Sequence, residues 1–548
     1  MRLPVPRALA LLIPVLFVSV LVTPILPAQE AADPEIGSLN QPDRLDWFRD
    51  QGFGLFIHWS LDSQLGVVIS HSLVGASPDY TDRFFTELPK SFNPRQFHPE
   101  DWATLAHLAG VRYMMFTTKH HSGFAMWDTQ TTPFGIMNTP FHRDITKEVF
   151  DAFRAQGIAT GVYYSPDDFS WLHEHNIPIE RHTEQVQPRN NAALIQYDQA
   201  QIRELLTGYG KVDALFLDGE PNGLRELAWK INPQIVVTRG AIKTPELTIP
   251  GMPIPGAWET CMTMGIGWQY QPQNEHYKSG GELIRMLIQT RAKGGNFLLN
   301  VGPKPNGELP IEEEERLREI GLWMFVNSES IYGVRSWVIT NEGDIWFTKK
   351  KDSSAIYAIV ESAQPWPRAT WKDFVLHSVR ATAKTEISVL GQNDKVVEYH
   401  PEINPKSTFH QEKDGLHIRV MAAQRLQDNF RWPNPTVIKL TNVEPAFIPP
   451  HVETLKATRT GSSATLEGKL DDMGDSSSLE ATFEYRPILG EDVNSRTSPW
   501  TATDTKTLSK PGPFSAKVED LDPRGAYEFR AVIHHPLLNL YGQEQQLK

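Results

Sequence analysis

Short apolar runs alternate with longer amphipathic stretches between about residues 45 and 335. Apolar residues recur at helical spacing in the stretches. Seven runs have the length and composition of buried strands: 54–59, 113–121, 160–165, 214–218, 235–239, 257–262 and 296–301. Strand and helix repeating over this length predict an α/β fold with a TIM-like (β/α)8 barrel. A doubly wound sheet is less favoured, because no glycine-rich phosphate or dinucleotide loop accompanies the pattern.

After Trp337 the pattern changes to short strand-like runs separated by polar turns, which is typical of antiparallel sheets. Pro445, Pro449 and Pro450 mark a linker between two such regions. We therefore predict a C-terminal β-sandwich domain at 337–446 and a fibronectin type III-like accessory domain at 447–548. The barrel domain is expected to occupy residues 29–336.

Residues 1–28 have the composition of a secretory signal peptide. Arg2 and Arg7 precede an apolar stretch from Ala8 to Val22, and the small-residue exit ends at Ala28. The alternative is a retained membrane anchor, for which the stretch is short. We expect an exported protein, periplasmic or extracellular, without stable membrane insertion.

Composition narrows the class of protein. The 548 residues exceed what one hydrophobic core supports, so several domains are expected. The formal net charge of -13 argues against nucleic acid as a partner. Cys261 is the only cysteine, which excludes an internal disulfide framework; we expect a buried, inert thiol. Composition does not determine the oligomeric state.

Asp218 follows the apolar run 212–217 and precedes Gly219, so a buried strand is expected to carry its carboxylate to the C-terminal mouth of the barrel. Phe216 should share that face, because alternate strand residues point the same way. A helix cap or an arginine partner is the alternative role for this carboxylate. Glu259, in the run 257–262, is a second candidate carboxylate. Two carboxylates from separate strand ends are what hydrolysis of a glycosidic bond requires.

The other predicted strand ends carry hydrogen-bonding and aromatic side chains. Imidazole and guanidinium groups donate to sugar hydroxyls, while tryptophan and tyrosine rings cover the apolar side of a pyranose. These side chains are His58, Trp59, Lys119, His120, His121, Tyr163, Ser165, Arg239 and Trp258. Together they predict a carbohydrate-binding pocket.

His120 and His121 also raise the question of a metal site. Adjacent strand residues point to opposite faces, and no cysteine or carboxylate lies at a familiar ligand spacing. We therefore expect no metal and no cofactor.

Seven strings, in this order, resemble the α-L-fucosidases of glycoside hydrolase family 29. The resemblance covers nearly all of 47–337, and the following β region is similar to that family's C-terminal domain. The strings are GLFIHWS (54–60), TTKHHSGFAMWD (117–128), GVYYSP (161–166), LFLDG (215–219), TRGAIKTPE (238–246), WETCMTMGIGWQY (258–270) and GGNFLLNVGPKPNG (294–307).

The resemblance implies a retaining exo-hydrolase that releases terminal L-fucose from fucosylated oligosaccharides or polysaccharides. Asp218 matches the nucleophile. Glu259 is the expected general acid/base, with Glu275 and Glu220 in reserve. The positions that match fucose-binding residues are His58, His120, His121, Tyr163 and Arg239.

Two departures from the family pattern bear on the rim of the pocket. Residues 77–82 read SPDYTD near the place where many members carry Glu-Trp-Tyr, and Ser122 stands where KHHDG is usual. We expect these differences to alter linkage preference more than fucose recognition.

Two other functions remain open from the sequence. Asp218-Gly219-Glu220 resembles the carboxylate pair of substrate-assisted N-acetylhexosaminide hydrolases, with Glu220 as the acid. An inactive barrel that only binds fucose is the second alternative.

Overall fold

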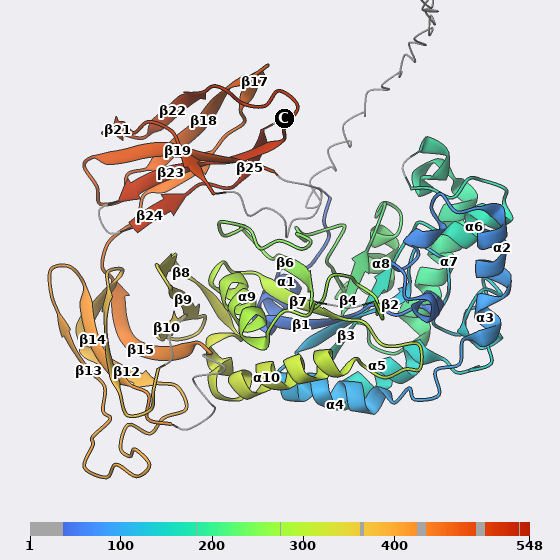
Figure 1. Ribbon diagram of the computed structural model, residues 1–548, viewed down its shortest axis with the longest axis horizontal. Helices are drawn as coiled ribbons and strands as arrows, with labels where there is room; N and C mark the ends of the chain where they lie inside the picture. The colour runs from blue at the N-terminus through green and yellow to red at the C-terminus, as the bar shows by residue number, and fades with distance from the viewer. Residues whose placement is uncertain are drawn as a thin grey trace, which may run out of the picture.

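The computed structural model describes residues 37–181, 183–273, 276–361, 366–424, 434–488, 499–535 and 538–547. The expected signal peptide, residues 1–28, lies outside these ranges. Figure 1 shows three parts: a barrel in blue to yellow, a first β-sandwich in orange and a second in red. The boundaries drawn from sequence at 336 and 446 stay predictions. None of the described helices is long and apolar enough to cross a membrane.

A parallel seven-stranded sheet forms the barrel, and each predicted run overlaps one of its strands. Its strand order is β5-β4-β3-β2-β1-β7-β6. The strands are β1 (Phe53–Ile57), β2 (Tyr113–Lys119), β3 (Ala159–Tyr164), β4 (Ala214–Leu217), β5 (Val236–Val237), β6 (Glu259–Thr263) and β7 (Asn296–Val301). The predicted α/β barrel class is therefore confirmed.

An irregular segment occupies the gap between β5 and β6. Leu217 N–H donates to the Arg239 carbonyl, and parallel bridges join Lys243 to Trp258 and Glu246 to Cys261. This segment makes isolated bridges instead of a continuous ladder. Its sequence accordingly shows no strand-like apolar run. It brings the loop after β5 to the mouth of the barrel.

Helices cover the outside of the sheet (Figure 1). Side chains on one face of the strands, such as Leu55 and Ile57, join the helices in the main core, while Phe56, Met115 and Phe216 belong to a separate cluster inside the barrel. This division follows from the two-residue period of a strand. The barrel-region helices are α1 (Pro42–Gln51), α2 (Pro78–Thr86), α3 (Leu88–Ser91), α4 (Pro99–Ala109), α5 (Ile145–Ala155), α6 (Phe169–Glu174), α7 (Ala192–Gly208), α8 (Arg225–Ile231), α9 (Gly280–Ala292) and α10 (Ile311–Asn327).

The first sandwich packs a five-stranded sheet, β12-β15-β10-β9-β8, against a three-stranded sheet, β11-β14-β13. All pairings within it are antiparallel, as predicted. Its strands are β8 (Val334–Glu342), β9 (Ile345–Lys350), β10 (Ile356–Val360), β11 (Trp371–Leu376), β12 (Val379–Val389), β13 (Thr408–Gln411), β14 (Leu416–Met421) and β15 (Thr436–Pro445).

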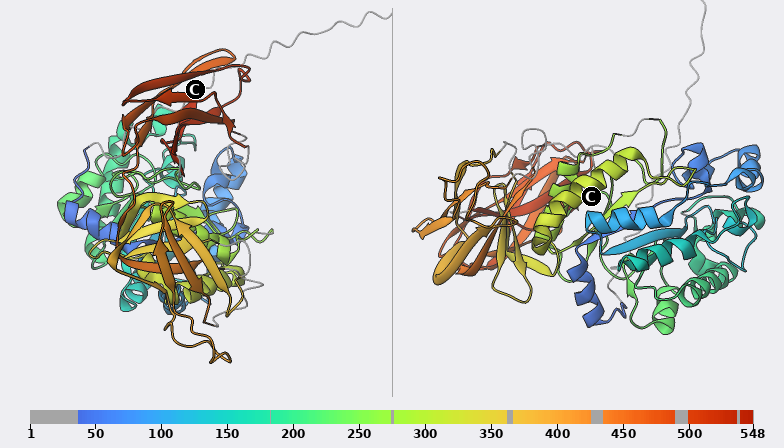
Figure 2. Two further views of the ribbon diagram at one scale, coloured as in Figure 1. Left: turned by 90° about the vertical axis from the view of Figure 1, so that its left-hand side faces the viewer. Right: turned by 90° about the horizontal axis from the view of Figure 1, so that it is seen from below.

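The second sandwich has its own core between a four-stranded and a six-stranded antiparallel sheet. It lies at the top of the molecule in Figure 1 and in the left view of Figure 2. Glu544 of this sandwich packs against Gly251 of the loop after β5. The likeness to fibronectin type III stays a prediction. Its strands are β16 (His451–Thr454), β17 (Thr458–Thr460), β18 (Ser463–Asp472), β19 (Leu479–Pro487), β20 (Thr501–Ala502), β21 (Lys506–Leu508), β22 (Gly512–Val518), β23 (Tyr527–His535), β24 (Leu538–Tyr541) and β25 (Gln545–Leu547).

Candidate active site

A cavity of about 620 Å³ opens at the C-terminal ends of the barrel strands. This is the usual position of a functional site in a (β/α)8 barrel, and the volume suits a small polar ligand. Its walls combine aromatic, basic and acidic side chains. The lining residues are Phe56, His58, Val68, Ile69, His71, Ser72, His120, His121, Tyr163, Arg181, Phe216, Asp218, Arg239, Glu246, Cys261 and Trp268.

Asp218 follows the last residue of β4 and holds its carboxylate in the cavity. Its Oδ2 accepts a hydrogen bond from the Tyr163 hydroxyl at 2.6 Å, and its Oδ1 accepts one from Arg239 Nη1 at 3.0 Å. Burial alone would raise the pKa of this carboxyl, but the positive charge of Arg239, with His121 and Arg181 nearby, outweighs burial and lowers that pKa well below its usual range. The group is therefore an ionised carboxylate inside a cavity, and it caps no described helix.

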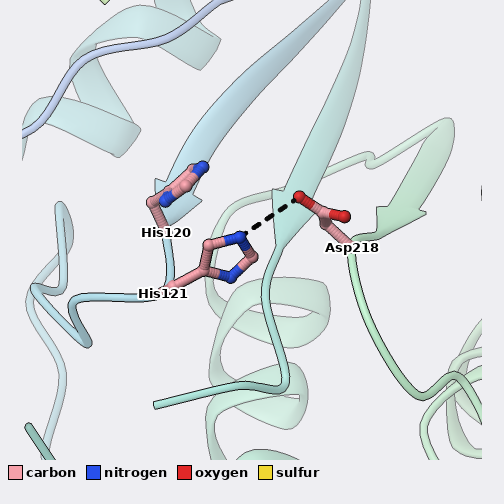
Figure 3. Close-up of side chains that lie close together, drawn as sticks. All are labelled: His120, His121 and Asp218. Carbon is pink, nitrogen blue, oxygen red and sulfur yellow. Dashed lines mark ion pairs between the residues drawn. The ribbon is translucent and has the colours of Figure 1, made fainter. Parts of the chain in front are cut away.

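His120 and His121 both line the cavity, with ring centroids 4.1 Å apart (Figure 3). His120 Nδ1 lies 2.9 Å from Ser70 Oγ, and His121 Nδ1 lies 2.6 Å from Ser165 Oγ. The expectation that they face opposite sides was wrong, because β2 ends at Lys119 and both histidines lie in the turn beyond it. Burial lowers the pKa of both rings well below its usual range, so both are neutral.

His121 Nε2 lies 3.6 Å from Asp218 Oδ2 (Figure 3). Ligand atoms of His120, His121 and Asp218 all lie within 4.8 Å of one another, close enough for a metal ion as well as for sugar hydroxyls. The sequence-based expectation that this pair is no metal site stays a prediction.

The turn that carries the two histidines is anchored by a buried charge network. Lys119 Nζ lies 2.9 Å from Asp168 Oδ2 and 3.2 Å from Asp198 Oδ1, and all three side chains are inaccessible to solvent. Asp168 also caps α6, because its Oδ1 accepts from Trp171 N–H at 2.8 Å. The end of β2 is thereby tied to the segment that follows β3.

An aromatic wall forms the other side of the cavity. The rings of His58 and Trp268 lie 4.9 Å apart, and those of Tyr163 and Phe216 stack at 5.5 Å. His58 Nδ1 contacts Asn300 Oδ1 at 2.6 Å, and burial lowers the pKa of His58 to about 4, so this imidazole is also neutral. Trp268 was not predicted to bind substrate, although it lies in the string 258–270.

Trp59 and Trp258 do not line the cavity, which corrects their predicted contact with a sugar. Trp59 packs against Phe92, Phe97 and Trp102 in the outer core, because it points to the face opposite His58. Trp258 is buried against Gly295, where even a Cβ atom would come within 2.5 Å of the indole.

The position predicted for Glu259 at the mouth of the barrel is also wrong. It is the first residue of β6 and pairs with Asn296, the first residue of β7, so it lies at the N-terminal end of both strands. Its side chain is fully buried, and Oε2 accepts from the Tyr113 hydroxyl at 2.8 Å. Burial raises the pKa of Glu259 to about 7. That pKa suits an acid/base, but the carboxyl does not line the cavity.

The raised pKa of Glu259 predicts a pH-dependent contribution to stability. An unfolded glutamate has a pKa near 4.5, so the contribution is fully present below that pH and is lost as the pH rises through about 7. Replacing Glu259 with Gln removes this dependence. We expect the free energy of unfolding of E259Q, relative to the unmodified protein, to rise by about 3 kcal/mol between pH 4.5 and pH 8. Urea denaturation at the two pH values measures it; a constant difference would contradict the burial argument.

Besides Trp268, three ionisable side chains of the cavity were missed by the sequence: His71, Arg181 and Glu246. Glu246 Oε2 accepts from Arg239 Nη2 at 2.6 Å, so one guanidinium contacts both Glu246 and Asp218. Arg181 is paired with Asp167 at 2.7 Å. Glu246 is the last residue of the string 238–246, and that string was the only sequence signal for it. His71 and Arg181 come from segments without hydrophobic periodicity.

Of the two reserve carboxylates, the structure describes only Glu220. Glu220 pairs with Arg189 at 3.1 Å and does not line the cavity, and Glu275 lies outside the described residues. Cys261 lines the cavity, and burial raises the pKa of its thiol well above the ordinary value, which fits the inert thiol expected from sequence.

Comparison with known proteins gives consistent results. The family model described as Alpha-L-fucosidase matches residues 20–329. Plasma alpha-L-fucosidase of Homo sapiens is 28% identical over 446 residues, which cover 70% of this chain and 91% of the relative.

Two solved structures extend the similarity to the fold. Alpha-L-fucosidase isoenzyme 1 from Paenibacillus thiaminolyticus is 28% identical with a TM-score of 0.58, and the match covers 73% of this chain and 99% of that one. Thermotoga maritima alpha-fucosidase in complex with fucose is 25% identical with a TM-score of 0.58, covering 75% and 100% of the two chains.

Proposed function

The chain belongs to the α-L-fucosidase family, glycoside hydrolase family 29, and from this we propose that it is a retaining exo-enzyme that releases terminal L-fucose from fucosylated glycans. The observation that carries the proposal is the ionised Asp218 carboxylate in the cavity. A carboxylate whose pKa lies well below its usual range is ionised, and therefore nucleophilic, at neutral pH.

In the first step Asp218 attacks the anomeric carbon while the leaving oxygen takes a proton, which gives a fucosyl ester. In the second step water gives up a proton and attacks the anomeric carbon of this ester, the bond between that carbon and the Asp218 oxygen breaks, and fucose leaves with its original configuration. Tyr163 and Arg239 hold the two carboxylate oxygens, so the nucleophile needs little reorganisation before it attacks.

We assign fucose binding to His58, His120, His121, Tyr163 and Arg239. The neutral imidazoles offer both a donor and an acceptor to hydroxyl groups. L-Fucose also carries a methyl group at C5, and the apolar surfaces of Phe216 and Trp268 can cover it.

We propose Glu246 as the general acid/base in place of Glu259. Among the described residues that line the cavity, Glu246 is the only carboxyl besides Asp218. Its side chain is 39% exposed, so a leaving group and water can reach it. Glu246 has to carry a proton in the first step, so its ion pair with Arg239 must weaken before that step. A sugar hydroxyl that binds the guanidinium weakens the ion pair.

Stereochemistry tests the proposed mechanism directly. Proton NMR of an aryl α-L-fucoside during hydrolysis should show α-L-fucose first, with the β anomer appearing only through mutarotation. The β anomer appearing first would reject retention. Cleavage of an N-acetylhexosaminide but no fucoside would favour the substrate-assisted alternative, and binding of fucose without hydrolysis of any fucoside would favour the non-catalytic one.

We further propose that residues 1–28 direct export. Detection of the protein, trimmed at its N-terminus, in a periplasmic or extracellular fraction supports this. Full-length protein confined to the cytoplasm would contradict it.

A further inference from the structure

The β13–β14 hairpin of the first sandwich carries a cluster of histidines and carboxylates, well away from the barrel strands in Figure 1. Ligand atoms of His410, Glu412 and His417 all lie within 4.8 Å of one another. None of these residues lines the active-site cavity. We propose that this hairpin binds one zinc-like divalent cation through His410, Glu412, His417 and Asp414.

The hairpin geometry places the side chains on one face. His410 and His417 are direct cross-strand partners, and their rings stack at 5.0 Å. Glu412 follows the last residue of β13, and its side chain turns toward His410, with Oε1 3.0 Å from His410 Nε2. Asp414 lies in the connecting turn. Both imidazoles meet the carboxylates through Nε2, which is a common zinc-ligating atom.

Three of the separations between donor atoms lie near that of a tetrahedral site. Zinc bonded to nitrogen and oxygen at about 2.1 Å has ligand atoms roughly 3.4 Å apart. His410 Nε2 lies 3.0 Å from Glu412 Oε1, and His417 Nε2 lies 2.8 Å from Asp414 Oδ1 and 3.9 Å from Glu412 Oε2. Two of these separations are shorter than the separation that tetrahedral zinc requires, and one is longer. Small rotations of side chains at the surface would therefore bring the donor atoms to that spacing.

The turn is held in place independently of any ion. Glu412 N–H donates to the Gly415 carbonyl at 2.9 Å. A Cβ atom at Gly415 would come within 2.8 Å of the Leu376 carbonyl, so the turn packs closely on the end of β11. The His377 ring contacts the Asp414 carbonyl oxygen. This support reduces the ordering cost of binding.

Isothermal titration of the tag-free, chelator-treated full chain with zinc chloride tests the proposal. We expect one equivalent to bind at the hairpin and the affinity to fall at least tenfold in H410A and in H417A. H451A is the matched control, because His451 is exposed and pairs with one carboxylate among the described residues, Asp471 at 3.0 Å. It should bind zinc as the unmodified protein does.

Two further measurements separate this site from the cavity and from misfolding. Zinc at the hairpin should leave fucoside hydrolysis unchanged, and it should raise the Tm of the unmodified protein but not that of H410A. Circular dichroism checks the fold of each variant. Absence of saturable zinc binding, or equal affinity in both histidine variants and the unmodified protein, would overturn the proposal.

Discussion

Asp218→Gly is expected to lower kcat for an aryl α-L-fucoside by roughly 10³- to 10⁵-fold, which corresponds to about 4–7 kcal/mol of lost transition-state stabilisation. The substitution removes the atom that bonds to the anomeric carbon. It also leaves Tyr163 and Arg239 without the carboxylate they hold. Steady-state kinetics with a fluorogenic fucoside measures the loss.

The reaction product distinguishes a lost nucleophile from a damaged site. The glycine variant leaves space for azide to attack from the face that Asp218 occupied, and a single displacement should yield β-L-fucosyl azide. Asp213→Asn is the matched control, because Asp213 is also buried, immediately precedes β4 and pairs with Arg44, yet does not line the cavity. We expect that variant to keep its kcat. Full activity of the Asp218 variant would remove this residue as the nucleophile.

Strand β4 shows how far a sequence pattern can position a functional group. Buried parallel strands are continuous apolar runs, and Gly219 marks where this run stops. The C-terminal end of such a strand in a barrel opens onto the site, so the position of Asp218 follows from these two signals. The structure places its carboxylate in the cavity accordingly.

Strand β6 shows where the same reasoning fails. The apolar run 257–262 begins two residues before β6 does, and Glu259 was assigned to the C-terminal end of this strand although it is its first residue and Thr263 is its last. An apolar run predicts that a strand exists more reliably than it predicts where the strand begins and ends. The side chains that reach a site at a strand end depend on those bounds.

The residues that sequence reasoning missed come from irregular segments. Glu246 belongs to the segment that bridges to β6 without forming a ladder, Arg181 belongs to a loop, and His71 begins a short 3-10 helix, His71–Leu73. No hydrophobic period marks such positions, because their place is fixed by contacts with distant parts of the chain. The contact of one guanidinium, that of Arg239, with both Asp218 and Glu246 can be recognised only in the three-dimensional structure.

Glu246→Ala is expected to lower kcat/KM by roughly 10²- to 10⁴-fold on fucosides with poor leaving groups, such as oligosaccharides. Their leaving oxygen needs a proton as the bond breaks. A 2,4-dinitrophenyl fucoside needs almost none, so its first step should slow by less than about tenfold. The ratio of the two effects is the signature of a lost acid, because general damage to the site would slow both substrates alike.

The second step provides the stricter test. Without a base the fucosyl ester on Asp218 accumulates, and azide, which needs no base, should react with it to give α-L-fucosyl azide, the anomer opposite to that from the Asp218 variant. E259Q should show neither the leaving-group dependence nor the azide product, because its side chain lies off the cavity. Glu275→Ala serves as the decisive comparison: if it, instead of the Glu246 variant, gives the α-azide, the proton comes from Glu275, while Asp218 keeps its role as nucleophile.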